Sequence, residues 1–340
     1  MKKLAIIQDY HPNFFDTYKE LEKHYDLEMI GDGRYFNCPK EVNNKLWKTK
    51  VTGNLYFGNP HTLFKHLKGH KLAMIKDFSQ PKSLVAIILC RLMGIKYVVT
   101  IQKISWADTK FKKHLLDLVA KRIVGRNTPI ICSVKAGFVS AHPYFNNLHY
   151  VPFAIKSKTT TKKYDIAGDV LKVLCVGKLT QERKNQIQLI KYLSTLLLRN
   201  QRLELTLVGD CKKENEYSQR LRQSAKGSRI KVIVKPNVAR ENMQREYLDA
   251  DVFMLSSRRE PAAYSVLEAM SYGLCVITSA DNGTRCYLPT HHIDLETDNY
   301  KINWVGLKKE GKRNVALAKK NHDPKVIVAK HVRILEELKC

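Results

Sequence analysis

Residues 251–278, DVFMLSSRREPAAYSVLEAMSYGLCVIT, contain the pattern that decides the fold. An apolar run at Val252–Ser256 predicts a buried strand, and a second run at Leu274–Thr278 predicts another. Between them, the apolar periodicity predicts a helix that starts near Ala263 and stops at Gly273. A strand, a helix and a second strand in this order are typical of a parallel sheet covered by helices.

The same alternation runs along the rest of the chain. Helical patterns, notably at 82–93 and 106–124, separate further apolar runs. The further candidate strands are Lys3–Gln8, Asp26–Ile30, Lys71–Ile75, Lys96–Ile101, Pro129–Ser133, His149–Val151, Leu171–Val176, Leu203–Val208 and Ile230–Val234. The predicted fold class is therefore α/β, with two Rossmann-like, doubly wound domains.

A polar run at 156–164, without any apolar period, predicts the linker between the two domains. We expect an N-terminal domain over residues 1–160, a C-terminal domain over 168–300, and C-terminal helices over 301–340 that can cross back to the N-terminal domain. Turn signals in segment 35–60 indicate an insertion or a short hairpin.

The composition limits the class of protein. The 340 residues are 44% hydrophobic and 27% charged, which excludes a disordered chain and a small disulfide scaffold. This length favours two domains because single cores stop growing at about 250–300 residues. The 59 Lys and Arg exceed the 32 Asp and Glu, giving a net charge of +27. Such an excess indicates a polyanionic partner: nucleic acid, an anionic membrane surface or a phosphorylated ligand.

The eight cysteines are far apart and form neither a CxxC pair nor a zinc-type cluster, so we expect no structural metal and a reducing, cytoplasmic environment. The apolar stretch near the start, Leu4–Ile7, is shorter than the core of a signal peptide. The longest apolar run, Leu84–Cys90, falls well short of the roughly 20 residues that span a bilayer. We therefore expect no membrane-spanning segment.

The loop that follows Val176 combines a glycine with cations. Gly177 allows a tight turn after the strand, and Lys178, Arg183 and Lys184 precede the next helix. The unpaired amides at the amino terminus of a helix favour anions, so this loop is a candidate clamp for a diphosphate. In a chain this basic, a solvated loop of cations is an equally good interpretation.

The next strand-to-helix loop to be considered holds a glutamate, and the helix after it holds another. Glu260 precedes the helix, and Glu268 lies on the same helical face as Tyr264. The amides of Tyr264 and Ser265 begin the helix and can donate to a phosphate, while Glu268 can accept hydrogen bonds from a ribose diol. The alternatives are a solvated carboxylate at Glu268 and, at Glu260, a loop charge paired to one of the two preceding arginines.

Glu260 and Glu268, with seven residues between them and Ala-Met-Ser-Tyr-Gly after them, resemble the signature of glycosyltransferase family 4. Three further matches follow that family's order: Gly177-Lys178 with Lys184, Leu205–Asp210, and Tyr247–Asp251. The resemblance rests on many motifs between residue 171 and about 288, whereas the first half matches only in its alternation of strands and helices. It implies the GT-B fold, in which two Rossmann-like domains face each other across a cleft. It also implies transfer of a sugar from a nucleotide donor with retention of anomeric configuration.

The resemblance implies roles for single residues. Glu268 would bind the donor ribose, Glu260 the hydroxyls of the transferred sugar, and the cations the diphosphate, where charge develops during the reaction. We expect no metal and no cofactor, with a nucleotide-diphosphate sugar as donor substrate. In retaining members the leaving phosphate helps to deprotonate the acceptor, so no enzymatic base is required. The expected catalytic residues are Glu260, Lys178 and Lys184, and the expected donor-binding residues are Gly177, Arg183, Tyr264, Ser265 and Glu268.

Three positions depart from the family pattern. Residues 8–13, after the first strand, contain no glycine, Gln102 stands where many members have a histidine, and Ala262-Ala263 replaces the usual glycine after the first glutamate. His11 and Asn13 are the residues of the first loop expected to face the cleft. A loop histidine without a role is an equally good interpretation of His11.

Basic residues interleave with aromatic and aliphatic ones in the first half. Residues 1–155 carry 24 Lys and Arg against 11 Asp and Glu. Trp47 and Phe64 lie among lysines, and the predicted helix 106–124 has an apolar arc beside five cations. This pattern suits an anionic membrane interface, although the apolar arc can also pack on its own sheet.

We expect a glycosyltransferase that is peripherally attached to the inner face of the cell membrane and acts on a lipid-linked or cell-envelope glycan, as in polysaccharide or lipopolysaccharide biosynthesis. Two alternatives stay open: transfer to nucleic acid or a soluble acceptor, and an inactive GT-B protein that binds nucleic acid or anions. The two glutamates argue against the inactive protein, because phosphate binding needs no carboxylate facing the ligand. We also expect the domains to close over the donor by bending near 155–168.

Overall fold

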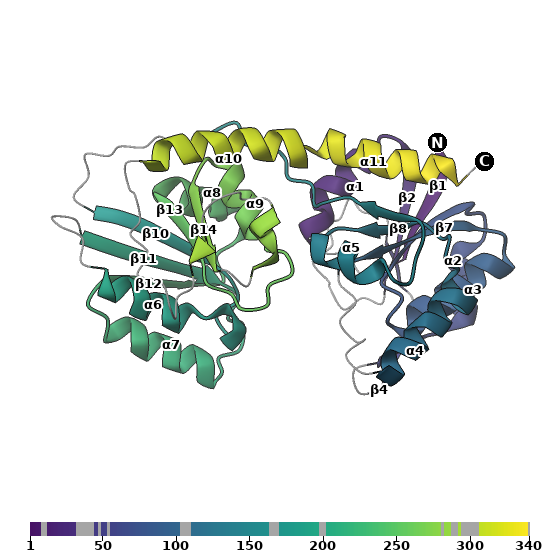
Figure 1. The fold of residues 1–340 in the computed structure, drawn as a ribbon, viewed down its shortest axis with the longest axis horizontal. Coiled ribbons are helices and arrows are strands. Elements are labelled where there is room, and N and C mark those ends of the chain that lie inside the picture. The colour runs from purple at the N-terminus through teal and green to yellow at the C-terminus, as the bar shows by residue number, and fades with distance from the viewer. Residues whose placement is uncertain are drawn as a thin grey trace. The chain divides into compact units, whose positions relative to one another are not determined.

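The structure is a computed structural model of the chain. It describes residues 1–7, 12–31, 44–46, 49–52, 55–102, 110–162, 170–196, 202–279, 282–286, 292–293 and 306–338. The chain forms two compact units: unit 1 consists of Met1–Ala154 and Pro324–Cys340, and unit 2 of Ile155–Asp323. The chain therefore passes between the units twice, and the last helix belongs to unit 1 (Figure 1).

Seven parallel strands form the sheet of unit 1, in the order β3-β2-β1-β6-β7-β8-β9. These strands are β1 (Lys2–Ile7), β2 (Tyr25–Gly31), β3 (Asn44–Leu46), β6 (Leu72–Lys76), β7 (Lys96–Ile101), β8 (Ile130–Cys132) and β9 (Leu148–Tyr150). The strands predicted in this half are confirmed to within two residues at either end. Segment 35–60 contains an antiparallel hairpin of β4 (Thr49–Thr52) and β5 (Leu55–Gly58), one of the two forms expected there.

Helices cover both faces of this sheet. They are α1 (Phe15–Leu21), α2 (Pro60–Leu67), α3 (Pro81–Leu92), α4 (Lys110–Val119) with its π-helical continuation η2 (Ala120–Val124), α5 (Lys135–Ala141) and α11 (Pro324–Glu337), besides the short 3₁₀ turn η1 (Pro12–Phe14). Successive side chains of β1 point to opposite faces and so enter two cores. Leu4 and Ile6 face α1 and α11, while Ala5 and Ile7 face α2, α3 and α4 (Figure 1).

Six parallel strands form the sheet of unit 2, in the order β12-β11-β10-β13-β14-β15. They are β10 (Val170–Val176), β11 (Arg202–Gly209), β12 (Lys231–Pro236), β13 (Val252–Leu255), β14 (Cys275–Ser279) and β15 (His292–Ile293). The five strands predicted here are again confirmed to within two residues. The predicted α/β class, with two parallel sheets, is thus correct.

The helices of unit 2 alternate with these strands. They are α6 (Gln186–Thr195), α7 (Glu216–Lys226), α8 (Met243–Asp249), α9 (Tyr264–Ser271) and α10 (Leu307–His322), with 3₁₀ turns η3 (Glu182–Lys184), η4 (Arg240–Asn242) and η5 (Gly283–Cys286). α6 packs with α7, and α9 packs with α10 and β14 (Figure 1). Within the described residues, no helix combines the length and the apolar composition needed to cross a bilayer.

The strand order of unit 2 reverses between β10 and β13. These two strands pair in parallel, with Val173 opposite Val252 and Leu174 opposite Phe253. From β10 the chain continues to β11 on one side, and from β13 it continues to β14 on the other. Loops that leave two neighbouring strands in opposite directions open a crevice at the carboxyl edge of the sheet, where ligands of such folds bind. The loops after β10 and β13 are therefore the first place to look for a site.

A close approach of two glycines fixes the shape of this edge. The amide of Gly177, just after β10, donates to the carbonyl oxygen of Val208 at 2.9 Å. A Cβ atom on Gly209 would lie only 1.9 Å from the carbonyl oxygen of Gly177. No side chain fits at position 209, so the end of β11 lies directly against the loop after β10.

Candidate functional site

The buried side chain of Gln186 lies within hydrogen-bond distance of the loop after β10, and the buried hydroxyl of Tyr217 fixes Gln186 in turn. The side-chain nitrogen of Gln186, a residue that is 1% exposed, lies 3.2 Å from the carbonyl oxygen of Lys178 and 3.4 Å from that of Gly177. The hydroxyl of Tyr217 donates to Oε1 of Gln186 at 2.8 Å and accepts from its backbone amide at 3.0 Å. This pair could not be predicted, because nothing in the local sequence pattern links residues on α6 and α7.

The loops after β10 and β13 are joined by two hydrogen bonds to backbone carbonyl oxygens. The hydroxyl of Ser256 donates to the carbonyl oxygen of Lys184 at 2.9 Å. Two residues later, the amide of Arg258 donates to the carbonyl oxygen of Arg183 at 2.7 Å. These bonds place the cations of the first loop beside the glutamate of the second.

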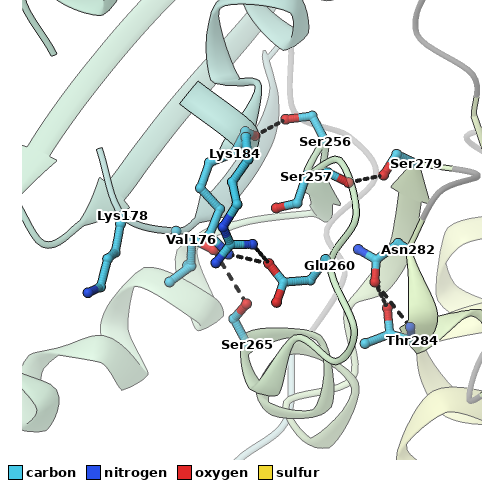
Figure 2. A network of polar contacts seen from close by, with 12 residues as sticks. Val176, Lys178, Lys184, Ser256, Ser257, Glu260, Ser265, Ser279, Asn282 and Thr284 are labelled. Carbon is cyan, nitrogen blue, oxygen red and sulfur yellow. Dashed lines mark hydrogen bonds and ion pairs between the residues drawn. The ribbon is translucent and has the colours of Figure 1, made fainter. Parts of the chain in front are cut away.

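An ion-pair cluster stands where the two loops meet (Figure 2). Oε2 of Glu260 accepts from Nζ of Lys184 at 2.5 Å and from Nη1 of Arg183 at 2.8 Å. The side chains of Glu260 and Lys184 are 8% and 11% exposed, whereas that of Arg183 is 46% exposed. We call these three residues the cation cluster. With two cations on one carboxylate it carries a net charge of +1, and Glu260 occupies the position from which an anion would bind both cations.

A turn after β14 supports Glu260 from the other side. Glu260 forms a parallel bridge with Asn282, and the amide of Gly283 donates to the carbonyl oxygen of Glu260 at 2.7 Å. Oδ1 of Asn282 accepts from the hydroxyl of Thr284 at 2.7 Å and from its amide at 3.1 Å (Figure 2). A Cβ atom on Gly283 would lie 2.2 Å from the carbonyl oxygen of Pro261, so only glycine permits this contact.

Two buried polar atoms flank the cluster without a hydrogen-bond partner among the described residues. They are Nδ2 of Asn282, in a residue that is 1% exposed, and Oγ of Ser257, in a residue that is fully buried. Ser257 is nevertheless held by its backbone, since Ser279 donates to its carbonyl oxygen at 2.6 Å. Buried groups of this kind are usually paired, and here they lie beside the candidate ligand position. The one signal for these residues in the sequence is the Asn-Gly pair at 282–283, after a buried strand.

The amino end of α9 lies at the same edge. Ala263 precedes the helix in an extended conformation, and within the described residues no side chain caps it. The first amides of a helix lack intrahelical acceptors, so those of Tyr264 and Ser265 point out of its end. The hydroxyl of Ser265 lies 3.4 Å from the carbonyl oxygen of Val176, at the end of β10 (Figure 2). The predicted amide donors are thus brought to the loop after β10, and Gly273, at φ +84°, follows the end of the helix as expected.

The second glutamate is positioned by a tyrosine of α8. The hydroxyl of Tyr247 donates to Oε2 of Glu268 at 2.8 Å, and its ring stacks on Tyr272 at 5.1 Å between centroids. Burial raises the pKa of Tyr247, and the carboxylate of Glu268 raises it further. The phenol therefore stays protonated and fixes the orientation of Glu268. In the sequence, Tyr247 stands out only as the first residue of the family match Tyr247–Asp251.

Lys178 stands apart from this arrangement. Lys178 is exposed, and its side chain extends away from Lys184 and Glu260 (Figure 2). Gly177 lies beneath the cluster, since a Cβ atom there would lie 3.3 Å from Cδ of Lys184. His11 lies outside the described residues, and Asn13 lies in η1 of unit 1. The described residues contain no group of three His, Cys, Asp or Glu that could hold a metal ion.

Taken together, these contacts can bind a diphosphate and the groups on either side of it. Two cations and the helix amides provide positive charge for the phosphates. A carboxylate next to the cations can accept hydrogen bonds from hydroxyl groups, as can a second carboxylate on the following helix turn. Because Glu260 neutralises one charge of the cluster, an incoming diphosphate has to take its place on Arg183 and Lys184.

Comparisons with known proteins bear on the family and the fold. Residues 156–294 match the family model described as glycosyl transferases group 1. The match spans the loops after β10 and β13 and both glutamates. No curated protein matches the chain.

Solved structures share the fold along the whole chain. A glycosyltransferase from Rickettsia africae ESF-5 is 14% identical with a TM-score of 0.78, covering 99% of this chain and 98% of that chain. Sucrose-phosphate synthase from Thermosynechococcus elongatus is 15% identical with a TM-score of 0.74, covering 99% of both chains. HepE of Anabaena, in complex with UDP-glucose, is 13% identical with a TM-score of 0.71, covering 100% of both chains. These similarities confirm the predicted GT-B fold of two Rossmann-like domains.

Proposed function

We propose that the protein is a retaining glycosyltransferase, which moves a sugar from a nucleoside-diphosphate sugar to a hydroxyl group. The observation that carries this proposal is the cation cluster at the switch point of a parallel sheet, with Glu260 bonded to Lys184 and Arg183. The match of residues 156–294 to glycosyl transferases group 1 supports it. HepE, which shares the fold, was solved with UDP-glucose bound, and this supports a nucleotide-sugar donor.

In the proposed reaction, the bond between the anomeric carbon and the diphosphate oxygen breaks, and a bond from that carbon to the acceptor oxygen forms. Lys184, Arg183 and the amides at Tyr264 and Ser265 stabilise the negative charge that collects on the leaving diphosphate. Glu260, displaced from the cations by the phosphates, accepts hydrogen bonds from hydroxyls of the transferred sugar. Attack occurs on the face that the diphosphate leaves, and a phosphate oxygen takes the acceptor proton, which gives retention.

The donor's nucleoside lies next to α9 in this proposal. Glu268, oriented by Tyr247, accepts hydrogen bonds from the ribose diol. Gly177 allows the backbone to approach the phosphates closely. No metal or further cofactor takes part, because the cations of the protein balance the diphosphate. Lys178 contributes only long-range charge, since it is exposed and apart from the cluster.

For the acceptor we propose a lipid-linked or cell-envelope glycan, reached from the cytoplasmic face of the membrane by a peripherally attached enzyme. The support for this part is the net charge of +27, far more than one diphosphate requires. A soluble acceptor is the alternative, and the similarity to sucrose-phosphate synthase favours it. Nucleic acid is a weaker alternative that rests on charge alone.

A donor screen tests the function. The full chain is incubated with a panel of uridine, guanosine, adenosine and thymidine diphosphate sugars, and proton NMR follows donor consumption with and without simple sugar acceptors. We expect one donor to be consumed and the new linkage to keep its anomeric configuration. Inversion of the anomeric configuration would overturn the retaining mechanism. Failure to bind or consume any donor would overturn the proposal that the protein is a glycosyltransferase.

A further inference from the structure

Two helices of unit 1 expose aliphatic side chains to solvent. On α3, Ile88 is 44% exposed and Leu92 is 78% exposed, and on α4, Leu115 is 41% and Leu118 is 48% exposed. Each pair is spaced by three or four residues, so its members share one face of their helix. The opposite faces of the same helices are buried in one core, for example at Cys90 and Leu116. We name these four residues the α3–α4 face.

The two helices belong to one continuous surface. Nη1 of Arg91, on α3, donates to the carbonyl oxygens of Arg122 at 3.1 Å and Ile123 at 2.9 Å, at the end of η2. α3 also packs against α2 and β5, which expose Phe64 (46%) and Phe57 (44%). α2, α3 and α4 lie together on the same side of the sheet of unit 1 (Figure 1). Exposed apolar side chains therefore recur across this whole helical layer.

The charge of this layer is strongly one-sided. Its helices carry eight Lys and Arg and a single acidic residue, Asp117. That carboxylate already pairs with Lys121 at 2.5 Å and with Arg126 at 2.7 Å. The cations are Lys65, Lys82, Arg91, Lys110, Lys112, Lys113, Lys121 and Arg122.

We propose that the α3–α4 face docks unit 1 on an anionic lipid bilayer. Aliphatic side chains that enter the acyl boundary, ringed by cations that meet acidic headgroups, are how helices bind in the plane of a membrane. A second copy of the chain would bring the same positive layer and so be repelled. Nucleic acid would pair with the cations but would leave the four aliphatic side chains in water. The inference locates the membrane attachment proposed above and is independent of the donor site.

Vesicle binding tests the face directly. The full chain is sedimented with vesicles of phosphatidylcholine alone and with vesicles containing three parts in ten of phosphatidylglycerol. We expect binding to the anionic vesicles only, weakened about tenfold by Leu92→Ser and again by Leu115→Ser with Leu118→Ser, since each variant removes aliphatic surface from the lipid. The matched control is Val326→Ser on α11, on the other face of the sheet. Val326 is an aliphatic residue that is 41% exposed, as Leu115 is, and the variant should bind like wild type. Lys113→Gln with Arg122→Gln should weaken binding and reduce its salt dependence.

Tryptophan fluorescence tests insertion into the bilayer without relying on a measured binding affinity. Leu92→Trp should shift its fluorescence to the blue with anionic vesicles and be quenched by brominated acyl chains, whereas Val326→Trp should show neither change. Donor binding, measured on the same preparations, should be unchanged in every variant, which separates this inference from the proposed function. Equal vesicle binding by wild type and all variants of the α3–α4 face would show that this face is not the docking surface. Absence of wild-type binding would overturn the proposed membrane attachment altogether. Self-association abolished by Leu92→Ser, or tighter binding to duplex DNA than to vesicles, would replace the bilayer with another partner.

Discussion

Glu260 acts as an internal anion for the two cations beside it. Its carboxylate and the ammonium of Lys184 are both largely buried, so neither charge is stable without a partner. In the proposed function, a donor diphosphate would supply negative charge of its own and compete for Lys184 and Arg183. We therefore expect the phosphates of the donor to displace Glu260, and the displaced carboxylate to accept hydrogen bonds from the sugar hydroxyls.

This competition predicts opposite effects of Glu260→Gln on two ligands. The neutral amide no longer competes for the cations, so a nucleoside diphosphate without sugar should bind about tenfold more tightly. Sugar transfer should fall by about a hundredfold, because the carboxylate that holds the sugar hydroxyls is lost. Titration calorimetry and steady-state transfer rates measure the two effects. Glu182→Gln, a nearby exposed carboxylate that pairs with Arg220, is the control. Weaker binding of the free diphosphate to Glu260→Gln would contradict the exchange.

At the scale of the elements, the close approach of β11 to the loop after β10 sets the position of the cation cluster. Gly209→Ala places a methyl group 1.9 Å from the carbonyl oxygen of Gly177, which forces the loop or the strand to move. We expect a loss of about 1–3 kcal/mol in the free energy of unfolding, as for other overpacked sites. Gly306→Ala, where the added methyl meets nothing, should change it by less than about 0.5 kcal/mol. Urea unfolding measures both, and equal stability of the two variants would rule out the steric account.

Helix α11 carries a buried histidine that makes unit 1 sensitive to acid. Burial lowers the pKa of His331 from its ordinary value of 6.5, and Nδ1 lies 3.0 Å from the carbonyl oxygen of Ile327. Between the lowered pKa and 6.5 the unfolded chain binds more protons, so stability falls as the pH drops through this window and is full above it. His331→Gln should flatten the fall in unfolding free energy between about pH 7.5 and about pH 5.5. A slope in His331→Gln similar to that of the wild type would refute this role of His331.

The elements themselves were predictable because their causes are local. Apolar runs, glycines at helix ends and the alternation of strands and helices predict the parallel sheets. The spacing of Glu260 and Glu268 predicts that both carboxylates belong to the same loop and helix. The partners of these carboxylates were not predictable, because Lys184, Tyr247 and Asn282 come from other elements and meet them only through the sheet order. For the same reason, the sequence suggests that Lys178 and Lys184 act together, although in the structure the side chain of Lys178 extends away from Lys184 (Figure 2).

The net positive charge is spread over both halves of the chain, and the chain passes between the two units more than once. Residues 1–155 carry 24 basic and 11 acidic residues, a net +13, so about half of the excess lies outside unit 2, which holds the cation cluster. The chain passes between the units twice, next to Ile155 and Asp323, and the amide of Ile155 donates to the carbonyl oxygen of His322 at 2.8 Å. Both residues of this hydrogen bond belong to unit 2, and we expect any bending between the units to occur at the two crossings.

Closure of the units on donor binding stays a prediction, and small-angle scattering tests it. Exclusion of water from the reacting centre requires the units to approach, so the radius of gyration should fall when the donor is added. A nucleoside monophosphate, which lacks the diphosphate and the sugar, should have little effect. Identical scattering curves with and without the donor would count against closure.

The most direct test of donor binding is one titration series on the full chain. The dissociation constant of the donor found in the screen is measured for wild type, Lys184→Ala, Glu268→Ala and Lys178→Ala. Loss of one charged partner at the diphosphate or the ribose should weaken binding about ten- to a hundredfold in the first two variants, and Lys178→Ala should weaken it less than about threefold. Wild-type affinity in both Lys184→Ala and Glu268→Ala, with the fold intact, would contradict a donor site at this edge of the sheet.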